Sequence, residues 1–235
     1  MLFDLIDAIQ SGSADALKWA FAGFLLSLPI IILAISVHEI AHGFVANKLG
    51  DPTAKNMGRL TLNPAKHFDP IGFLCMVAFG FGWAKPVPIS TRNFKKPRRD
   101  MAISAIAGPI SNILLAFLFA GLLKIFWVIL ARIPLFEATE LTMNILSFIR
   151  ILLELGIHLN ITFAIFNLLP IPPLDGSKIL YMFLPQKTLI KFLEYERYIA
   201  LALLILLAVG ALSWPLNFVT GKIINLISFI FNMPL

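Results

Sequence analysis

Uncharged apolar runs of membrane-spanning length recur along this chain and predict its main helices. They cover residues 19–37, 101–123, 155–174 and 198–221, with lengths of 19, 23, 20 and 24 residues. An α-helix needs about 20 apolar residues to cross the hydrocarbon core of a bilayer. We therefore expect four spanning helices, and we expect the first to continue as helix as far as Leu49.

Two shorter apolar runs predict something different. Residues 70–84 form an uncharged run of 15 that contains three glycines, and residues 223–235 form a short run after Trp214-Pro215. Because 15 residues are too few for a span, the first run is expected to be re-entrant or interfacial. The second is expected to return toward the membrane or to lie on it. The predicted fold is an all-α integral membrane protein, a polytopic transmembrane helix bundle with a short membrane-associated β or re-entrant segment.

The composition agrees with this fold. Hydrophobic residues make up 59% and charged residues 14%, against roughly 45–50% and about 25% in soluble domains. A chain of this size is expected to form a single domain, 1–235, with its core at about 17–180 and C-terminal helices at about 193–235. The net charge of +6 is assigned to residues beside the membrane. A lipid bilayer is therefore an expected partner, and nucleic acid is not.

The distribution of charge orients the bundle. Residues 50–100 contain nine Lys or Arg and three acidic residues, whereas the segment before residue 19 contains one Lys and three Asp. The positive-inside rule places residues 50–100 in the cytoplasm. The first helix then runs inward, and its last third lies toward the cytoplasmic side of what we expect to be a bacterial cell (inner) membrane.

Candidate chemistry begins at the end of the first apolar run, with His38-Glu39-Ile40-Ala41-His42. Residues i and i+4 lie on one face of a helix, so the two imidazoles can bind one cation. Glu39 lies beside them and can act as a general base. The pattern can occur by chance on a soluble helix, but ionisable groups at membrane depth are functional by default. We therefore expect His38 and His42 to be zinc ligands.

A catalytic zinc takes three protein ligands, so a third must come from elsewhere. The candidates are His67, Asp69, Glu154, His158 and Asp175. Asp175 follows three prolines that break an apolar span at its cytoplasmic end, and it can turn toward the histidines from there. The alternative is a proline-rich loop in which Asp175 caps the next helix. His67 is expected to be solvated, and His158 to be packed or hydrogen-bonded.

Two further features interrupt apolar sequence. Asn112 could donate to a reacting carbonyl or orient a ligand, or it could form an interhelical hydrogen bond beside small residues such as Gly108. The other feature is a stretch rich in glycine and proline, which could be an extended edge that pairs with a substrate strand or an irregular loop. Its residues are Gly82, Trp83, Lys85, Pro86, Val87 and Pro88.

Together, three ordered motifs resemble the site-2 protease family of intramembrane zinc metalloproteases. The motifs are residues 38–42, 108–112 and 167–176, and the resemblance covers about 31–179. It implies one Zn²⁺ per chain with Asp175 as its third ligand and Glu39 as the catalytic base. It also implies supporting roles for Asn112 and Asn167 near the reacting carbonyl, and a membrane-associated β-segment at 82–88. The resemblance is to the compact form, without a PDZ or nucleotide-sensing domain.

The expected function is that of an intramembrane zinc metalloendopeptidase with its site toward the cytoplasmic side. Its substrates would be membrane-spanning proteins or peptides, cleaved for regulated intramembrane proteolysis or for clearance of membrane peptides. A divalent-cation transporter is the alternative, since it too would place His, Asp and Asn at broken helices. That alternative does not readily explain Glu39 between the histidines. A third hypothesis, an inactive member that scaffolds membrane segments, conflicts with the intact set of ligands and base.

Overall fold

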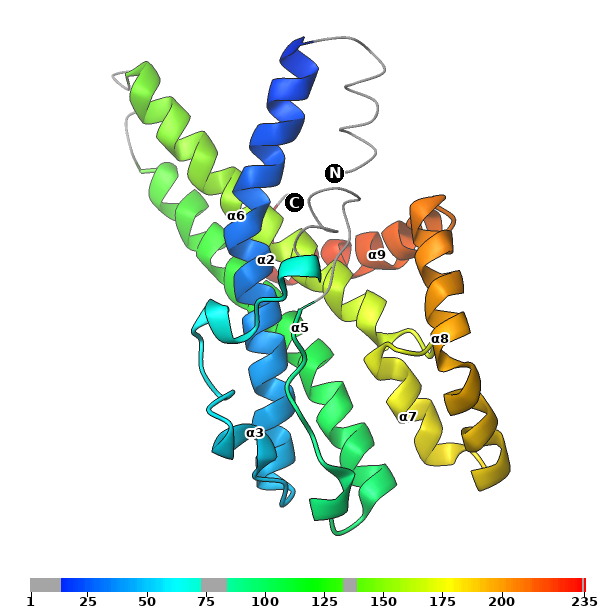
Figure 1. Ribbon diagram of the computed structural model, residues 1–235. Helices are drawn as coiled ribbons and strands as arrows, with labels where there is room; N and C mark the ends of the chain where they lie inside the picture. The colour runs from blue at the N-terminus through cyan, green and yellow to red at the C-terminus, as the bar shows by residue number, and fades with distance from the viewer. Residues whose placement is uncertain (1–13, 73–83, 133–138, 234) are drawn as a thin grey trace.

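The computed structural model describes residues 14–72, 84–132, 139–233 and 235, and its regular structure there is entirely helical, without a strand (Figure 1). Four long apolar helices are candidate membrane spans: α2 (Ala14–Lys48), α5 (Pro97–Leu130), α6 (Glu140–Leu168) and α9 (Ser213–Phe231). The remaining elements connect them or flank them. These are α3 (Thr53–Asn56), η1 (Pro64–Lys66), η2 (Thr91–Asn93), α7 (Asp175–Phe183) and α8 (Gln186–Ala208).

The four long helices are each apolar and long enough to cross a membrane, with α2 counted from Phe21. The prediction of an all-α polytopic membrane protein is thereby confirmed, and the first helix does continue past the histidine pair. Outward-facing leucines on α5 agree with contact to lipid: Leu114 is 64% exposed and Leu118 is 58% exposed. Exposed apolar residues of this size on a long helix suit a hydrocarbon surrounding better than water.

The expected single span at 198–221 is wrong, because the chain turns between α8 and α9. Gly210 has a φ of +73°, a left-handed conformation that glycine adopts without steric cost. Pro215 then lies in the first turn of α9, where its missing N–H removes no helical hydrogen bond. The turn residues are as apolar as the helices beside them, so hydropathy could not show the break. The expected short run at 223–235 belongs largely to α9.

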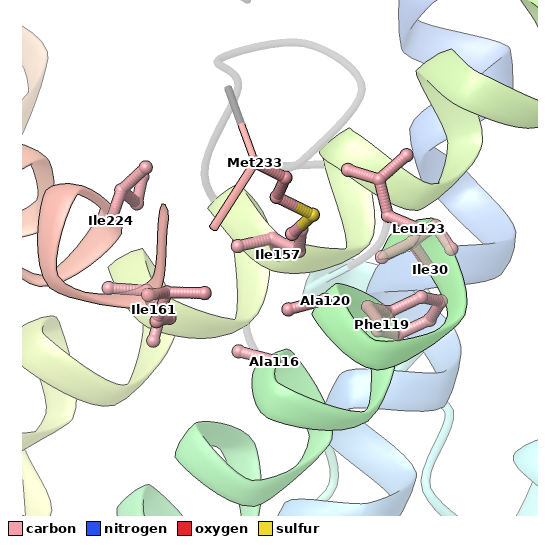
Figure 2. Packing of buried hydrophobic residues seen from close by; sticks show 10 residues of the cluster. Ile30, Ala116, Phe119, Ala120, Leu123, Ile157, Ile161, Ile224 and Met233 are labelled. Carbon is pink, nitrogen blue, oxygen red and sulfur yellow. The ribbon is translucent and has the colours of Figure 1, made fainter. Parts of the chain in front are cut away.

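α5 is the central helix of the bundle, since α2, α6 and α7 all pack against it, and α9 packs on α6 (Figure 1). Apolar residues from α2, α5, α6, α9 and the C-terminal tail form one core (Figure 2). Gly156 allows close contact there, because a Cβ on it would lie 2.5 Å from the ring of Phe119. The labelled core residues are Ile30, Ala116, Phe119, Ala120, Leu123, Ile157, Ile161, Ile224 and Met233.

Asp51 anchors the connection between α2 and α5. Its buried carboxylate accepts hydrogen bonds from the backbone and hydroxyl of Thr53, the backbone N–H of Ser90 and the amide of Asn93. Burial opposes ionisation, but these hydrogen bonds together hold the pKa of Asp51 below its ordinary value. The ionised carboxylate therefore ties residues 90–93 to the end of α2, and the preceding residues 84–89 run beside that helix.

Candidate metal centre

The side chains of His38, His42 and Asp175 meet at a buried point between α2, α5 and α7. The Nε2 atoms of the two histidines are 2.9 Å apart, and each is 3.0 Å from Oδ2 of Asp175. All three residues are buried. The i,i+4 spacing on α2 thus places two potential ligand atoms next to a third, which comes from α7.

Gly108 lets α5 lie directly against both imidazoles. A Cβ on Gly108 would lie 2.5 Å from Cε1 and Nε2 of His42 and 2.6 Å from Cε1 of His38. A glycine inside a helix is less favourable than alanine by about 1 kcal/mol. This position requires glycine all the same, because any side chain would push the helix away from the histidines.

The other ring nitrogen of each histidine faces a hydrogen-bond acceptor. Nδ1 of His38 is 2.6 Å from Oδ1 of Asn112, and Nδ1 of His42 is 2.7 Å from the backbone oxygen of Ser104. Since a carbonyl oxygen only accepts, both imidazoles donate from Nδ1. In the neutral rings both Nε2 atoms then carry lone pairs toward Asp175.

The amide of Asn112 is oriented by two partners of its own. Its Nδ2 donates to the backbone oxygen of Ala34 at 3.1 Å and to Oδ1 of Asn160 at 3.0 Å. Because the Ala34 oxygen can only accept, the nitrogen must lie on that side and Oδ1 must face His38. Asn112 is therefore the acceptor that sets the tautomer of His38, the arrangement usual around a metal-bound histidine.

The three convergent atoms fit a zinc ion. Two lone pairs and a carboxylate oxygen at this spacing repel one another unless a cation or proton lies among them. In a tetrahedral zinc site with ordinary bond lengths, ligand atoms lie roughly 3.3–3.5 Å apart, close to the separations of 2.9–3.0 Å in this site. Two imidazoles and one carboxylate leave a fourth position open, which is the donor set of a catalytic zinc.

Asp175 reaches the histidines from the first residue of α7, not from a capping position. Leu174 is the N-cap residue, so the alternative in which Asp175 caps the helix is not observed. Nζ of Lys178 donates to Oδ1 of Asp175 at 2.9 Å, which leaves Oδ2 for the histidines. Gly176 lets this turn pack on the end of α6, because its Cβ would lie 2.2 Å from the oxygen of Leu168.

Glu39 lies beside the two histidines and is half-buried. Its Oε2 accepts a hydrogen bond from the backbone N–H of Val87 at 2.6 Å. Lys85, Pro86, Val87 and Pro88 therefore lie next to the candidate base, in a stretch without regular secondary structure. Gly82 and Trp83, like Cys75 and most of the expected re-entrant run, lie outside the described residues.

Other candidates are not brought to this point. Asn167 donates from Nδ2 to the oxygen of Phe163 in its own helix, so its supporting role stays a prediction. Asp69 accepts from the backbone of Gly72, and Glu154 pairs with Arg150, as i,i+4 spacing suggests. Across the ranges that the structure describes, His38, His42 and Asp175 form the one group of three potential metal ligands.

The expectation that His67 is solvated is wrong, because only 3% of its surface is exposed. Its Nε2 donates to the backbone oxygen of Thr61 at 2.8 Å, and its own backbone oxygen accepts from Lys85. Polar neighbours along the sequence suggested a loop on the surface, but the loop folds back on itself and encloses the ring. His158 is exposed on α6, away from the packed site that we expected for it.

Sequence reasoning missed three contributors to the site: Ser104, Asn160 and Lys178. Asn160 has the same signal as Asn112, an amide inside an apolar span, and could have been found. Ser104 acts through a backbone oxygen, which leaves no trace in residue type. Lys178 belongs to a basic region in which nothing distinguishes a lysine paired with Asp175 from a solvated one.

Comparison with known proteins identifies the family. The sequence model described as peptidase family M50 matches residues 24–210.

The chain belongs to peptidase family M50. This is the site-2 protease family, and the M50 chain is a zinc metalloprotease. It is 40% identical to "Putative zinc metalloprotease YwhC" of Bacillus subtilis over an alignment that covers 86% of this chain and 90% of that protein.

Two other similar proteins carry the same description in their names. MJ0611 of Methanocaldococcus jannaschii is 31% identical, covering 75% of this M50 chain and 83% of its own length. Rip2 of Mycolicibacterium smegmatis is 27% identical, covering 90% of this chain and 81% of its own. No solved structure matches significantly.

Proposed function

We propose that this M50 peptidase is an intramembrane zinc endopeptidase, which hydrolyses peptide bonds within membrane-spanning proteins or peptides. The observation that carries the proposal is the convergence of His38, His42 and Asp175, with Glu39 beside them, among helices long enough to cross a bilayer. A protease that acted only on soluble substrates would have no need to place its metal ligands on such helices.

In this proposal His38, His42 and Asp175 hold the zinc. Bound zinc supplies Lewis-acid activation of water and of the substrate carbonyl. Asn112 and the Ser104 oxygen keep both imidazoles in the tautomer that leaves Nε2 free. Asn112 therefore supports the reaction through His38, since all of its polar atoms are already bonded, and not as a donor to the reacting carbonyl.

Glu39 is the proposed general base and acid. Its carboxylate accepts a proton from the attacking water and passes it to the leaving amine when the peptide bond breaks. Oε2 is held by Val87, so Oε1 is the oxygen available for this transfer. A peptide bond inside a substrate helix is protected by its own hydrogen bonds, and the substrate must therefore unwind locally at the site.

We further propose that the active site lies toward the cytoplasmic side of a bacterial cell membrane. The histidines lie on the last third of α2, and the basic residues 50–100 follow directly. The positive-inside rule supports a cytoplasmic position for that segment.

The proposal is tested with purified protein and a reporter that contains one transmembrane segment. We expect the wild type to cleave it, and we expect a zinc chelator to stop cleavage and added zinc to restore it. Glu39→Gln should retain zinc but lose activity by several orders of magnitude, because the base is gone. His158→Ala, which alters an exposed histidine, is the matched control and should remain active.

Zinc content tests the ligand assignment separately from the activity. We expect about one zinc per chain by elemental analysis, with most of it lost in His42→Ala and none in His158→Ala. Full zinc content in His42→Ala would contradict the ligand assignment. Cleavage at the wild-type rate by Glu39→Gln would remove Glu39 from the mechanism, and absence of cleavage by zinc-loaded wild type would contradict the proposed activity.

A further inference from the structure

Four hydrogen bonds to their backbone atoms hold residues 85–87, and one of the four is accepted by Glu39 of α2. The N–H of Lys85 donates to the oxygen of His67 at 2.9 Å. Nη2 of Arg59 donates to the oxygens of Lys85 and Pro86 at 2.7 and 3.1 Å. The N–H of Val87 donates to Glu39. A stretch without regular secondary structure is thus fixed on both sides, by Arg59 and His67 on one and by the candidate base on the other.

Side-chain packing fixes the same residues in register with α2. Gly43 lies one helical turn beyond Glu39, and a Cβ on it would be 2.9 Å from Cγ1 of Val87 and 2.7 Å from Cδ2 of Leu60. The side chain of Val87 therefore packs where any side chain on residue 43 would collide with it. Its backbone N–H is brought beside Glu39 as a result, since residues i and i+4 share a helix face.

The residue that binds the backbone oxygens of Lys85 and Pro86 is a buried arginine, Arg59. Only 7% of its surface is exposed, and its contacts through Nη2 are to backbone oxygens. A buried cation is costly unless its donors are paired, so its place in the loop depends on these oxygens. Hydrogen bonds from a charged donor are roughly twice as strong as neutral ones, and here one guanidinium group fixes two successive peptide units.

We propose that Arg59 is a positioning residue for the catalytic base. By holding the oxygens of Lys85 and Pro86, it fixes the peptide unit whose N–H binds Oε2 of Glu39 and thereby directs Oε1 toward the metal centre. The inference rests on the proposed function, because it assumes that Glu39 is the base. A flexible glutamate would otherwise sample several rotamers, and a misplaced base transfers protons poorly.

The same contacts bear on substrate binding. Pro86 and Pro88 have no N–H, and the N–H groups of Lys85 and Val87 are already bonded. Residues 85–88 therefore have no N–H group to offer an incoming substrate strand. The Val87 N–H binds the candidate base Glu39 instead. A substrate strand that paired through N–H donors would therefore need residues outside 85–88.

The test compares steady-state kinetics and zinc content of five variants in the full chain. Arg59→Gln removes the charge and the guanidinium group, Arg59→Lys retains the charge, and Val87→Pro removes the N–H that binds Glu39. Arg92→Gln removes an exposed basic residue from the same connection and is the matched control. Val87→Ala retains the N–H but trims the side chain, which separates packing from hydrogen bonding.

We expect Arg59→Gln and Val87→Pro to lower kcat roughly 10- to 100-fold, as a misplacement of about 1 Å at a catalytic group can do. KM and zinc content should stay near the wild-type values. Arg59→Lys should recover part of the loss, whereas Arg92→Gln should have normal kcat and Val87→Ala a smaller defect than Val87→Pro.

Three results would overturn the inference. An unchanged kcat in Val87→Pro would show that the N–H does not position the base, and this variant decides the matter if Arg59→Gln does not fold. A raised kcat would mean that the contact restrains the base instead of aiming it. A rise in KM alone would assign the stretch to substrate binding. Each requires an active wild type, so failure of the proposed function is seen first and separately.

Discussion

Asn112 is fully buried, and its polar atoms have partners on two other helices. Its amide joins Ala34 and His38 on α2 to Asn160 on α6. At the scale of single residues, the interhelical hydrogen bonding expected of Asn112 is observed, and the same amide faces a candidate ligand, whose orientation by Asn112 stays a prediction. A polar group in apolar surroundings needs partners, and here satisfying that need also prepares the metal site.

Asn112→Ala should weaken zinc binding about 10- to 100-fold, which is typical when an outer-shell partner of a ligand is lost. The reason is that Nδ1 of His38 loses its acceptor, so the ring is no longer held in one tautomer. Zinc affinity measured by competition with a chelator checks this. Asn56→Ala, at an exposed position, is the control, and wild-type affinity in Asn112→Ala would refute the orienting role.

At the scale of elements, the approach of α5 to α2 decides whether the histidines meet their partners. Gly108 touches both imidazoles, while Ser104 and Asn112 lie one turn to either side of it. The three residues occupy one face of α5 because their spacing follows the helical period. A single helix thus delivers the close contact and both Nδ1 acceptors.

Gly108→Ala should therefore disrupt the site. A Cβ at 2.5 Å from an imidazole forces α5 outward, and overpacking of this kind costs typically 1–3 kcal/mol. We expect reduced zinc content, lost proteolysis and a lower thermal midpoint in detergent. Gly221→Ala is the control, since its Cβ meets nothing within 4 Å, and alanine should be neutral or stabilising by up to about 1 kcal/mol there. Equal behaviour of the two variants would contradict this account of α5.

At the scale of the whole molecule, the long helices determine which connecting segments lie at the same end of the bundle. α3 and the start of α5 lie toward one end, and the start of α6 lies at the other (Figure 1). α5 is 34 residues long, so at 1.5 Å per residue it exceeds the thickness of a hydrocarbon core. Its two ends therefore belong to opposite faces of the membrane, which agrees with the alternation of basic and less basic connections.

Single cysteines should report this topology in a Cys75→Ala background. Lys55→Cys and Lys96→Cys should both react with an impermeant thiol reagent only from the cytoplasmic side, and Arg132→Cys only from outside. The reason is that Lys55 and Lys96 lie in the basic stretch that the positive-inside rule places inside. Labelling of Lys55→Cys and Lys96→Cys from opposite sides would mean that residues 70–84 cross the membrane, and would contradict the proposed orientation.

By itself, the sequence determined three of the long helices and which residue types carry the chemistry. Apolar runs of sufficient length predicted α2, α5 and α6. A pair of histidines on α2 indicated the metal site, because ionisable groups are costly in hydrocarbon and rarely occur there without a function. The turn between α8 and α9 escaped notice, since its residues are as apolar as their neighbours. Only the tertiary structure decided that Asp175, and not His67 or His158, faces the histidines. It alone decided that the Ser104 oxygen, Lys178 and the backbone of Val87 complete the surroundings. The Ser104 oxygen and the backbone of Val87 come from segments far from the histidines in the chain and act through backbone atoms, which leave no periodic signal in the order of residues.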